Sequence, residues 1–190
     1  VLVVDWDLEA PGIERFFSER NPSLAAQRHT KPGVADLISA KAQGMELDWS
    51  DCLLQAKVPD SAVPVSILSA GRNDESYTRH VQSFDFEKLF TEHALGDYIE
   101  KLRNEWARKF EFVLIDSRTG ITDIGGICTI HLPDILVLLF TTTDPSVDGV
   151  LDDFKRARPG QSKRRRGRPR MIALPVASRR RSRTVTRLEH

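Results

Sequence analysis

The sequence predicts an α/β fold in which a mostly parallel sheet is covered by helices on both faces. The first observation behind this prediction is that short apolar runs alternate along the chain with segments of helical periodicity. The second is that no internal repeat interrupts this alternation. The third is composition: 190 residues with 40% hydrophobic and 29% charged residues are enough to bury a sizeable core.

The first half of the chain contains two predicted strands and two predicted helices. Residues 1–4 are four apolar β-formers and predict a buried strand, which runs into Asp5 and Asp7. Residues 11–19 begin with Pro11 and predict a short helix, and residues 33–44 form a second one with apolar residues on one face. After a polar, acidic stretch, residues 63–72 ("VPVSILSAGR") read as a strand that ends in small residues.

In the second half, apolar residues at mostly three-to-four spacing over 86–109 predict one long or broken helix. Residues 110–120 ("FEFVLIDSRTG") and 134–144 ("DILVLLFTTTD") are apolar runs that predict strands. A helix is expected from Val147 to about Arg156, and residues 171–179 ("MIALPVASR") predict a last strand.

The charge is distributed unevenly. The formal net charge is +1, but residues 1–154 hold 14 Lys and Arg against 26 Asp and Glu, whereas residues 155–190 hold 14 against 1. An acidic body with a basic tail indicates a contact with nucleic acid or an anionic surface, or pairing of the tail with the body.

Several classes of protein do not fit the sequence. The longest apolar run, residues 135–140, is far shorter than the ~20 residues of a transmembrane helix, and no signal peptide is recognisable. A cytoplasmic protein is therefore expected. Cys52 and Cys128 lack the spacing of a metal site or a disulfide framework, so we expect both to be buried small apolar residues.

Three predicted strands end in polar or small residues: Asp5 and Asp7, then Asp116 and Ser117, then residues 141–144. Ligands of open α/β sheets bind outside the carboxyl ends of the strands, so these ends are expected to converge on one site for a small anionic ligand, with or without a metal ion. An aspartate at the end of an apolar strand suits a magnesium site of the Walker B type. The alternative is that these aspartates only cap the following turns or helices.

Five stretches, taken in order, resemble the ParA/MinD-like family of deviant Walker P-loop ATPases. They are "VLVVDWDLEAPG", "GVADLI", "LSAGR", the long segment from "FEFVLIDSRTG" to "TTTDPSVDG", and "LPVASR". Within that family the resemblance is strongest to a bacterial subgroup associated with tetratricopeptide-repeat and signalling modules. It implies a three-layer, P-loop NTPase-like fold, with residues 1–156 as a partial ATPase domain, 157–170 as a basic linker, 171–187 as the last strand and tail of the same domain, and 188–190 as a possible tag remnant.

The resemblance also implies roles for individual residues. Asp7 stands where the family positions the attacking water, and Asp5 where it helps to organise Mg²⁺. Asp116 stands at the Walker B position and would contact Mg²⁺ through water. The remaining implied positions are the γ-phosphate-sensing loop and the neighbourhood of the adenine, namely Thr119, Gly120, Asp123 and Pro175.

The function implied by the resemblance is an ATP- and Mg²⁺-dependent switch that closes a homodimer and hydrolyses ATP slowly, with a repeat or signalling protein as a possible partner. The chain has no "GxxxxGK[ST]" and no deviant "KGGxGK[ST]" segment, although a P-loop ATPase holds the phosphates with such a loop. We therefore expect an N-terminally truncated ATPase fragment that binds ATP weakly and does not hydrolyse it.

The basic segment supports an alternative function. "SKRRRGRPR", residues 162–170, resembles an AT-hook, whose arginines lie in the narrow minor groove of A·T-rich DNA. In this alternative the protein binds DNA through Arg164, Arg165, Arg166 and Arg168. The segment also fits a solvated connector, and the whole chain fits a scaffold domain that keeps only the fold.

Overall fold

The computed structural model describes residues 1–59, 61–72, 74–117, 127–161 and 171–178. The chain forms two compact units, Val1–Leu132 and Pro133–His190. The domain limits predicted at residues 156 and 170 fall inside the second unit and stay a prediction.

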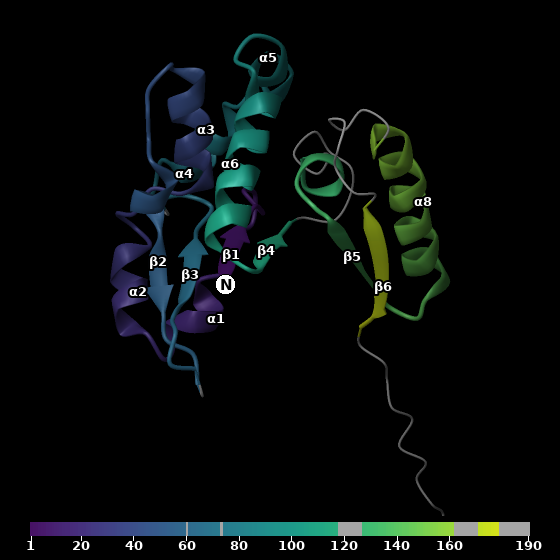
Figure 1. The fold of residues 1–190 in the computed structure, drawn as a ribbon, viewed down its shortest axis with the longest axis horizontal. Coiled ribbons are helices and arrows are strands. Elements are labelled where there is room, and N and C mark those ends of the chain that lie inside the picture. The colour runs from purple at the N-terminus through teal and green to yellow at the C-terminus, as the bar shows by residue number, and fades with distance from the viewer. Residues whose placement is uncertain (60, 73, 118–126, 162–170, 179–190) are drawn as a thin grey trace, which may run out of the picture. The chain divides into compact units, whose positions relative to one another are not determined.

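The first unit is built on a four-stranded sheet in the order β2-β3-β1-β4 (Figure 1). β1 pairs in parallel with β3 on one side and with β4 on the other, whereas β2 is antiparallel to β3. The bounds of these strands are Leu2–Asp5 for β1, Leu54–Ala56 for β2, Val65–Leu68 for β3 and Val113–Asp116 for β4. The prediction of an α/β fold with a mostly parallel sheet is therefore confirmed.

Helices cover both faces of this sheet. Leu2 and Val4 of β1 belong to the larger hydrophobic core, which they share with α3 (Val34–Ala42) and α6 (Leu95–Lys109). Val3, which points to the opposite face, packs in a smaller core with residues of α1 (Arg15–Ser18) and α2 (Pro22–Gln27). The first unit consequently has three layers, helices on either side of one sheet.

The segment predicted as one long or broken helix is broken. α5 (Phe86–Thr91) ends before α6 begins, and Ala94 between them has a left-handed backbone with φ of 49°. Elements that the sequence analysis did not predict are only three to six residues long: α2, α4 (Tyr77–Gln82), the 3₁₀ turn η1 (Trp49–Cys52), strand β2 and the π-helical turn η2 (Ile127–His131).

The start of α3 is joined directly to the end of β3. The backbone amides of Val34 and Ala35 donate to the carbonyl oxygens of Ser69 and Ala70, at 2.9 and 2.8 Å. A Cβ atom at Gly33 would lie 2.2 Å from the carbonyl oxygen of Ser69, which is far inside van der Waals contact. Glycine is therefore required at position 33 for helix and strand to approach this closely.

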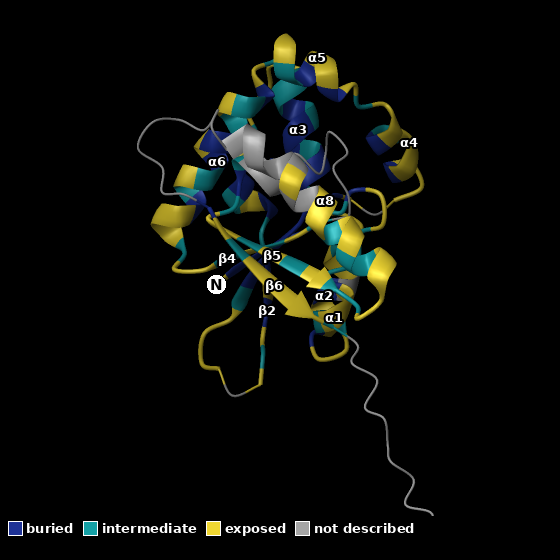
Figure 2. Ribbon diagram, turned by 90° about the vertical axis from the view of Figure 1, so that its right-hand side faces the viewer, coloured by how far each residue is buried: buried dark blue, intermediate teal, exposed yellow. Residues whose placement is uncertain are grey.

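The second unit contains the two-stranded parallel sheet of β5 (Ile135–Phe140) and β6 (Ile172–Ala177), together with α8 (Asp144–Gln161). Its strands show many exposed apolar side chains, among them Ile135, Leu139 and Ile172 (Figure 2). Across the described residues, no helix combines the length and apolar character that a bilayer span requires. Cys52 and Cys128 are both buried and free, as predicted.

Candidate functional site

The carboxyl ends of β1 and β4 bring two of the predicted site residues side by side. Asp5 and Asp116 are direct partners in the parallel register of these strands. Beyond the ladder, the backbone amide of Trp6 donates to the carbonyl oxygen of Asp116 at 2.8 Å. Neighbouring strands lie about 4.8 Å apart, so the loop after β1 and the end of β4 form one continuous edge.

Asp5 is completely buried, and its carboxylate holds the loop that follows β1. Its Oδ1 accepts the backbone N–H of Asp7 at 3.1 Å, and its Oδ2 accepts those of Gly12 and Ile13 at 2.9 and 3.0 Å. Burial raises the pKa of Asp5 most strongly, the amide donors lower it, and the nearby charge of Glu14 raises it further. Asp5 therefore positions the loop, and its predicted part in organising Mg²⁺ stays a prediction.

Asp7 projects from the loop that Asp5 holds. Its side chain is half-buried, and its Oδ1 accepts the backbone N–H of Ala10 at 3.1 Å. Among the described residues, Oδ2 has no hydrogen-bond partner. Asp7 thus keeps one carboxylate oxygen for a ligand.

Asp116 is exposed at the end of β4, within electrostatic reach of Asp7. Although more than a third of its surface is accessible, desolvation by the surrounding protein is the main cause that raises the pKa of its carboxyl. The charge of Asp7 raises it further, and the backbone N–H of Ser117 lowers it. Two carboxylates that repel one another at a strand edge disfavour an anion and favour a cation.

Among the described residues, no positive charge is found to shift the pKa of Asp5 or Asp116. The charges found to act on Asp5 and Asp116 come from Glu14 and Asp7 and are negative. In the described segments, no group of three or more His, Cys, Asp or Glu is placed to hold a metal ion by itself. Two carboxylates do fit Mg²⁺, which is usually bound by one or two carboxylates, with water and phosphate oxygens as the other ligands.

Two residues that the sequence analysis did not single out support the loop after β1. Tyr77 of α4 is buried and donates its hydroxyl to the carbonyl oxygen of Leu8 at 3.0 Å. Glu14 is 3% exposed, and its Oε2 has no hydrogen-bond partner among the described residues. Tyr77 lies 69 residues from Leu8, so local sequence patterns could not have revealed the contact.

None of the other predicted site residues belongs to the described part of the first unit. Thr119, Gly120 and Asp123 lie outside the described residues, as do Arg164, Arg165, Arg166 and Arg168. Pro175 is an exposed residue in the middle of β6, opposite Leu138, and Asp144 begins α8. Both belong to the second unit, so their predicted roles stay predictions.

Comparison with known proteins bears on the family. No protein-family model matches the sequence, and no curated protein matches it. Among solved structures, the chain is similar to the crystal structure of the VpsO kinase domain, with a TM-score of 0.51 and 18% sequence identity. The match covers 93% of this chain and 70% of that chain.

The expected ParA/MinD-like family is wrong. Neither that family nor any other is matched by a family model, and a solved structure that does match is titled a kinase domain. The pattern that suggested the family consists of apolar strands with aspartates at their ends, which different α/β folds share. At 18% identity the similarity establishes the fold alone.

Proposed function

We propose that the edge formed by β1 and β4 binds Mg²⁺ and the phosphates of a nucleotide, and that the protein takes part in phosphoryl transfer from ATP. The proposal includes a finer fold class, a three-layer nucleotide-binding fold of the P-loop NTPase kind. The observation that carries it is the juxtaposition of Asp7 and Asp116 at the carboxyl ends of adjacent parallel strands. The similarity in fold to a kinase domain favours the same chemistry.

Each carboxylate has a part in this proposal. Mg²⁺, when bound, neutralises phosphate charge and orients the transferred group. Asp116 is exposed at a rigid strand end and suits a role in holding the hydrated ion. Asp7, with its free Oδ2, suits the orientation of the acceptor, which is a water molecule or a hydroxyl group.

Asp5 acts on this chemistry through the backbone. Its three amide contacts close the loop from Asp7 to Ile13, so the position of the Asp7 carboxylate depends on a buried group. Positioning of this kind matters because displacement of a catalytic group by about 1 Å can cost about 100-fold in rate.

The proposed site lacks a phosphate-binding group in the part of the chain that is described. The first amides of α3, a helix that starts at the same edge of the sheet, donate to Ser69 and Ala70 and are not available to an anion. The carboxylates alone repel a nucleotide, so Mg²⁺ must precede or accompany it. ATP-dependent closure of a homodimer stays part of the proposal.

The test uses Mn²⁺ as a paramagnetic substitute for Mg²⁺, with the full chain labelled with ¹⁵N. We expect Mn²⁺ to broaden the amide signals of residues 6–8 and 116–117 first, and excess Mg²⁺ to reverse the broadening. Asp7→Asn and Asp116→Asn should each weaken the effect, whereas Asp51→Asn, at an exposed aspartate of η1, should not. Broadening that is unchanged in both site variants would refute the proposal.

A further inference from the structure

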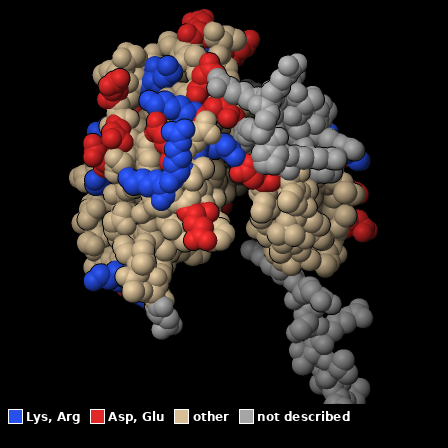
Figure 3. Space-filling model, in the orientation of Figure 1, with Lys and Arg blue, Asp and Glu red and all other residues tan. Residues whose placement is uncertain are grey.

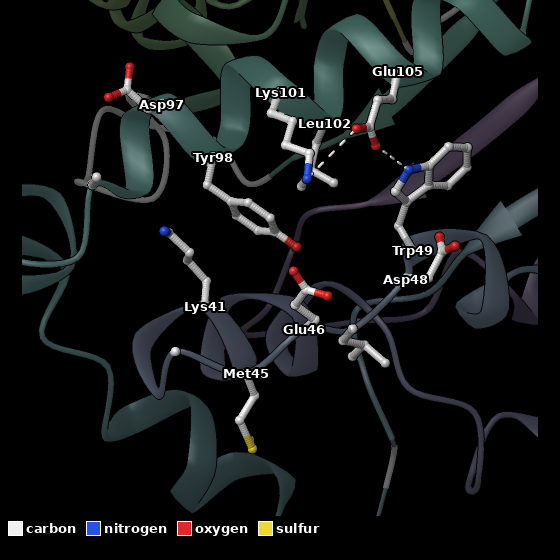
Figure 4. Close-up of a pocket in the computed structure, with 13 residues that line it drawn as sticks. Lys41, Met45, Glu46, Asp48, Trp49, Asp97, Tyr98, Lys101, Leu102 and Glu105 are labelled. Carbon is white, nitrogen blue, oxygen red and sulfur yellow. Dashed lines mark hydrogen bonds and ion pairs between the residues drawn. The ribbon is translucent and has the colours of Figure 1, made fainter.

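The first unit contains a cavity with a volume of about 820 Å³. One wall is the segment from Gly44 to Trp49, which follows α3, and the other is the first half of α6 (Figure 4). None of the aspartates of the proposed phosphate site lines it. Its volume falls in the range of about 300–1,000 Å³ typical of small-ligand sites.

The floor of the cavity is apolar and aromatic. Tyr98 and Leu102 follow one another at i, i+4 on α6, and Trp49 faces them from the other wall. Trp49 is 7% exposed and held rigidly, because its Nε1 donates to Glu105 at 2.7 Å and its ring packs edge-on against Trp106. Such a floor suits the aliphatic stem of a ligand.

The rim of the cavity is charged, with an excess of carboxylates. The lining includes four carboxylates and two ammonium groups, those of Glu46, Asp48, Asp97 and Glu105 and those of Lys41 and Lys101. Lys101 lies 3.9 Å from Glu105, which offsets part of its charge. In Figure 4 the carboxylate of Glu46 and the hydroxyl of Tyr98 point toward each other across the opening.

The hydroxyl of Tyr98, a residue that lines the cavity, lies near several acidic groups. Burial raises the pKa of Tyr98 to about 12, and the charges that act on it, including those of Glu105 and Asp48, raise it as well. Hydrogen bonds from Ser50, and after them the charges of Lys109 and Lys101, lower the pKa of Asp48 on the same rim. On the face shown in Figure 3, Lys and Arg are interspersed with Asp and Glu.

The geometry points to a binding site for the basic side chain of a peptide, with the aliphatic stem on Tyr98 and the ammonium or guanidinium group among the carboxylates of the rim. The same wall already binds a cation of this type, since Lys109 Nζ lies 5.0 Å from the centre of the Trp49 ring on its own chain. This site is independent of the proposed phosphate site.

Three blocked tripeptides test the inference on the full ¹⁵N-labelled chain: Gly-Arg-Gly, Gly-norleucine-Gly and Gly-Glu-Gly. We expect Gly-Arg-Gly to shift the amide signals of residues 44–49 and 95–105, with a Kd of about 1 mM. Norleucine keeps an aliphatic stem without the charge and should bind more weakly. Absence of shifts with about 10 mM Gly-Arg-Gly, or equal binding of Gly-Glu-Gly, would overturn the inference.

Charge reversal at the rim gives a second readout. Glu46→Lys should weaken Gly-Arg-Gly binding by about tenfold and Glu46→Gln by about threefold, because Glu46 is exposed and its charge is partly screened. Glu87→Lys, an exposed acidic position on α5 that does not line the cavity, is the matched control and should leave binding unchanged. Equal affinities for the wild type and Glu46→Lys would show that the peptide does not use this cavity.

Discussion

The hydroxyl of Tyr77 donates to the carbonyl oxygen of Leu8 at 3.0 Å, and this buried contact ties α4 to the loop that presents Asp7. The Tyr77→Phe substitution leaves the Leu8 carbonyl without its partner. We expect a loss of about 1–2 kcal/mol in the free energy of unfolding. Urea denaturation measures it, and Tyr98→Phe is the control, since no hydrogen bond of its hydroxyl to the described residues is found. Equal effects of the two substitutions would contradict this prediction.

Asp5 should make stability depend on pH in a specific direction. The pKa of its carboxyl is raised above the ordinary value of 3.8, so the folded state holds this proton more tightly than the unfolded state. The resulting stabilisation is fully present below pH 3.8 and is lost as the pH rises through the folded-state value. Urea denaturation between pH 7 and pH 4 should therefore show the wild type gaining stability relative to Asp5→Asn as the pH falls. Parallel curves would be evidence against the raised pKa.

Glu14 places a second buried negative charge near Asp5, and its Oε2 has no described partner. Glu14→Gln removes this charge with little change of shape. We expect the pKa of Asp5 to fall in a ¹³C-carboxyl titration and the protein to become more stable at pH 7 by about 1 kcal/mol. Glu19→Gln, an exposed neighbour at the end of α1, should change neither quantity.

The Gly33→Ala substitution should strongly lower the free energy of unfolding. The added Cβ would meet the Ser69 carbonyl oxygen at 2.2 Å, and α3 would have to move away from the end of β3. We expect a loss of about 3 kcal/mol or more in unfolding free energy. Gly44→Ala is the comparison, because Gly44 has φ of +68° but nothing within 4 Å, so only about 1–2 kcal/mol of backbone strain is expected.

Binding of ATP to this chain should be weak, and hydrolysis should not be measurable. The proposed site carries carboxylates that suit Mg²⁺ and the acceptor, but the described residues supply no phosphate-binding group. The described charges that act on Asp5 and Asp116 are negative and repel the phosphates of ATP. Calorimetric titration of ATP in the presence of Mg²⁺, with a phosphate-release assay, measures both properties. A micromolar Kd would contradict the prediction.

Most strands could be predicted from the sequence because each is marked by a run of apolar residues that are adjacent in the chain. Short apolar runs such as residues 1–4 and 110–120 have few alternatives to a strand; β1 lies within one residue of the first run, and β4 lies inside the second. β2 and α4 were missed because they are only three and six residues long, too short for a hydrophobic period to be recognised. Their formation depends on pairing with β3 and on the burial of Tyr77 and Val81, which are contacts with distant parts of the chain.

The family could not be predicted from the same signals. Apolar strands that end in aspartate, such as the one leading to Asp116, are shared by unrelated α/β proteins, because ligands bind at this edge of the sheet. The prediction of a mixed α/β fold with a mostly parallel sheet is therefore confirmed, the family is wrong, and the P-loop NTPase-like fold that the resemblance implied stays a prediction.

The sequence by itself determined where the strands and their terminal aspartates lie, because strand formation depends on residues next to one another. Only the tertiary structure decided which aspartates remain accessible. Asp5 and Asp7 are two residues apart, yet backbone amides as far along as Ile13 bind the carboxylate of Asp5, and β4 places Asp116 beside Asp7. The cavity between the Gly44–Trp49 segment and α6 likewise exists only through packing, since its walls come from segments about 50 residues apart.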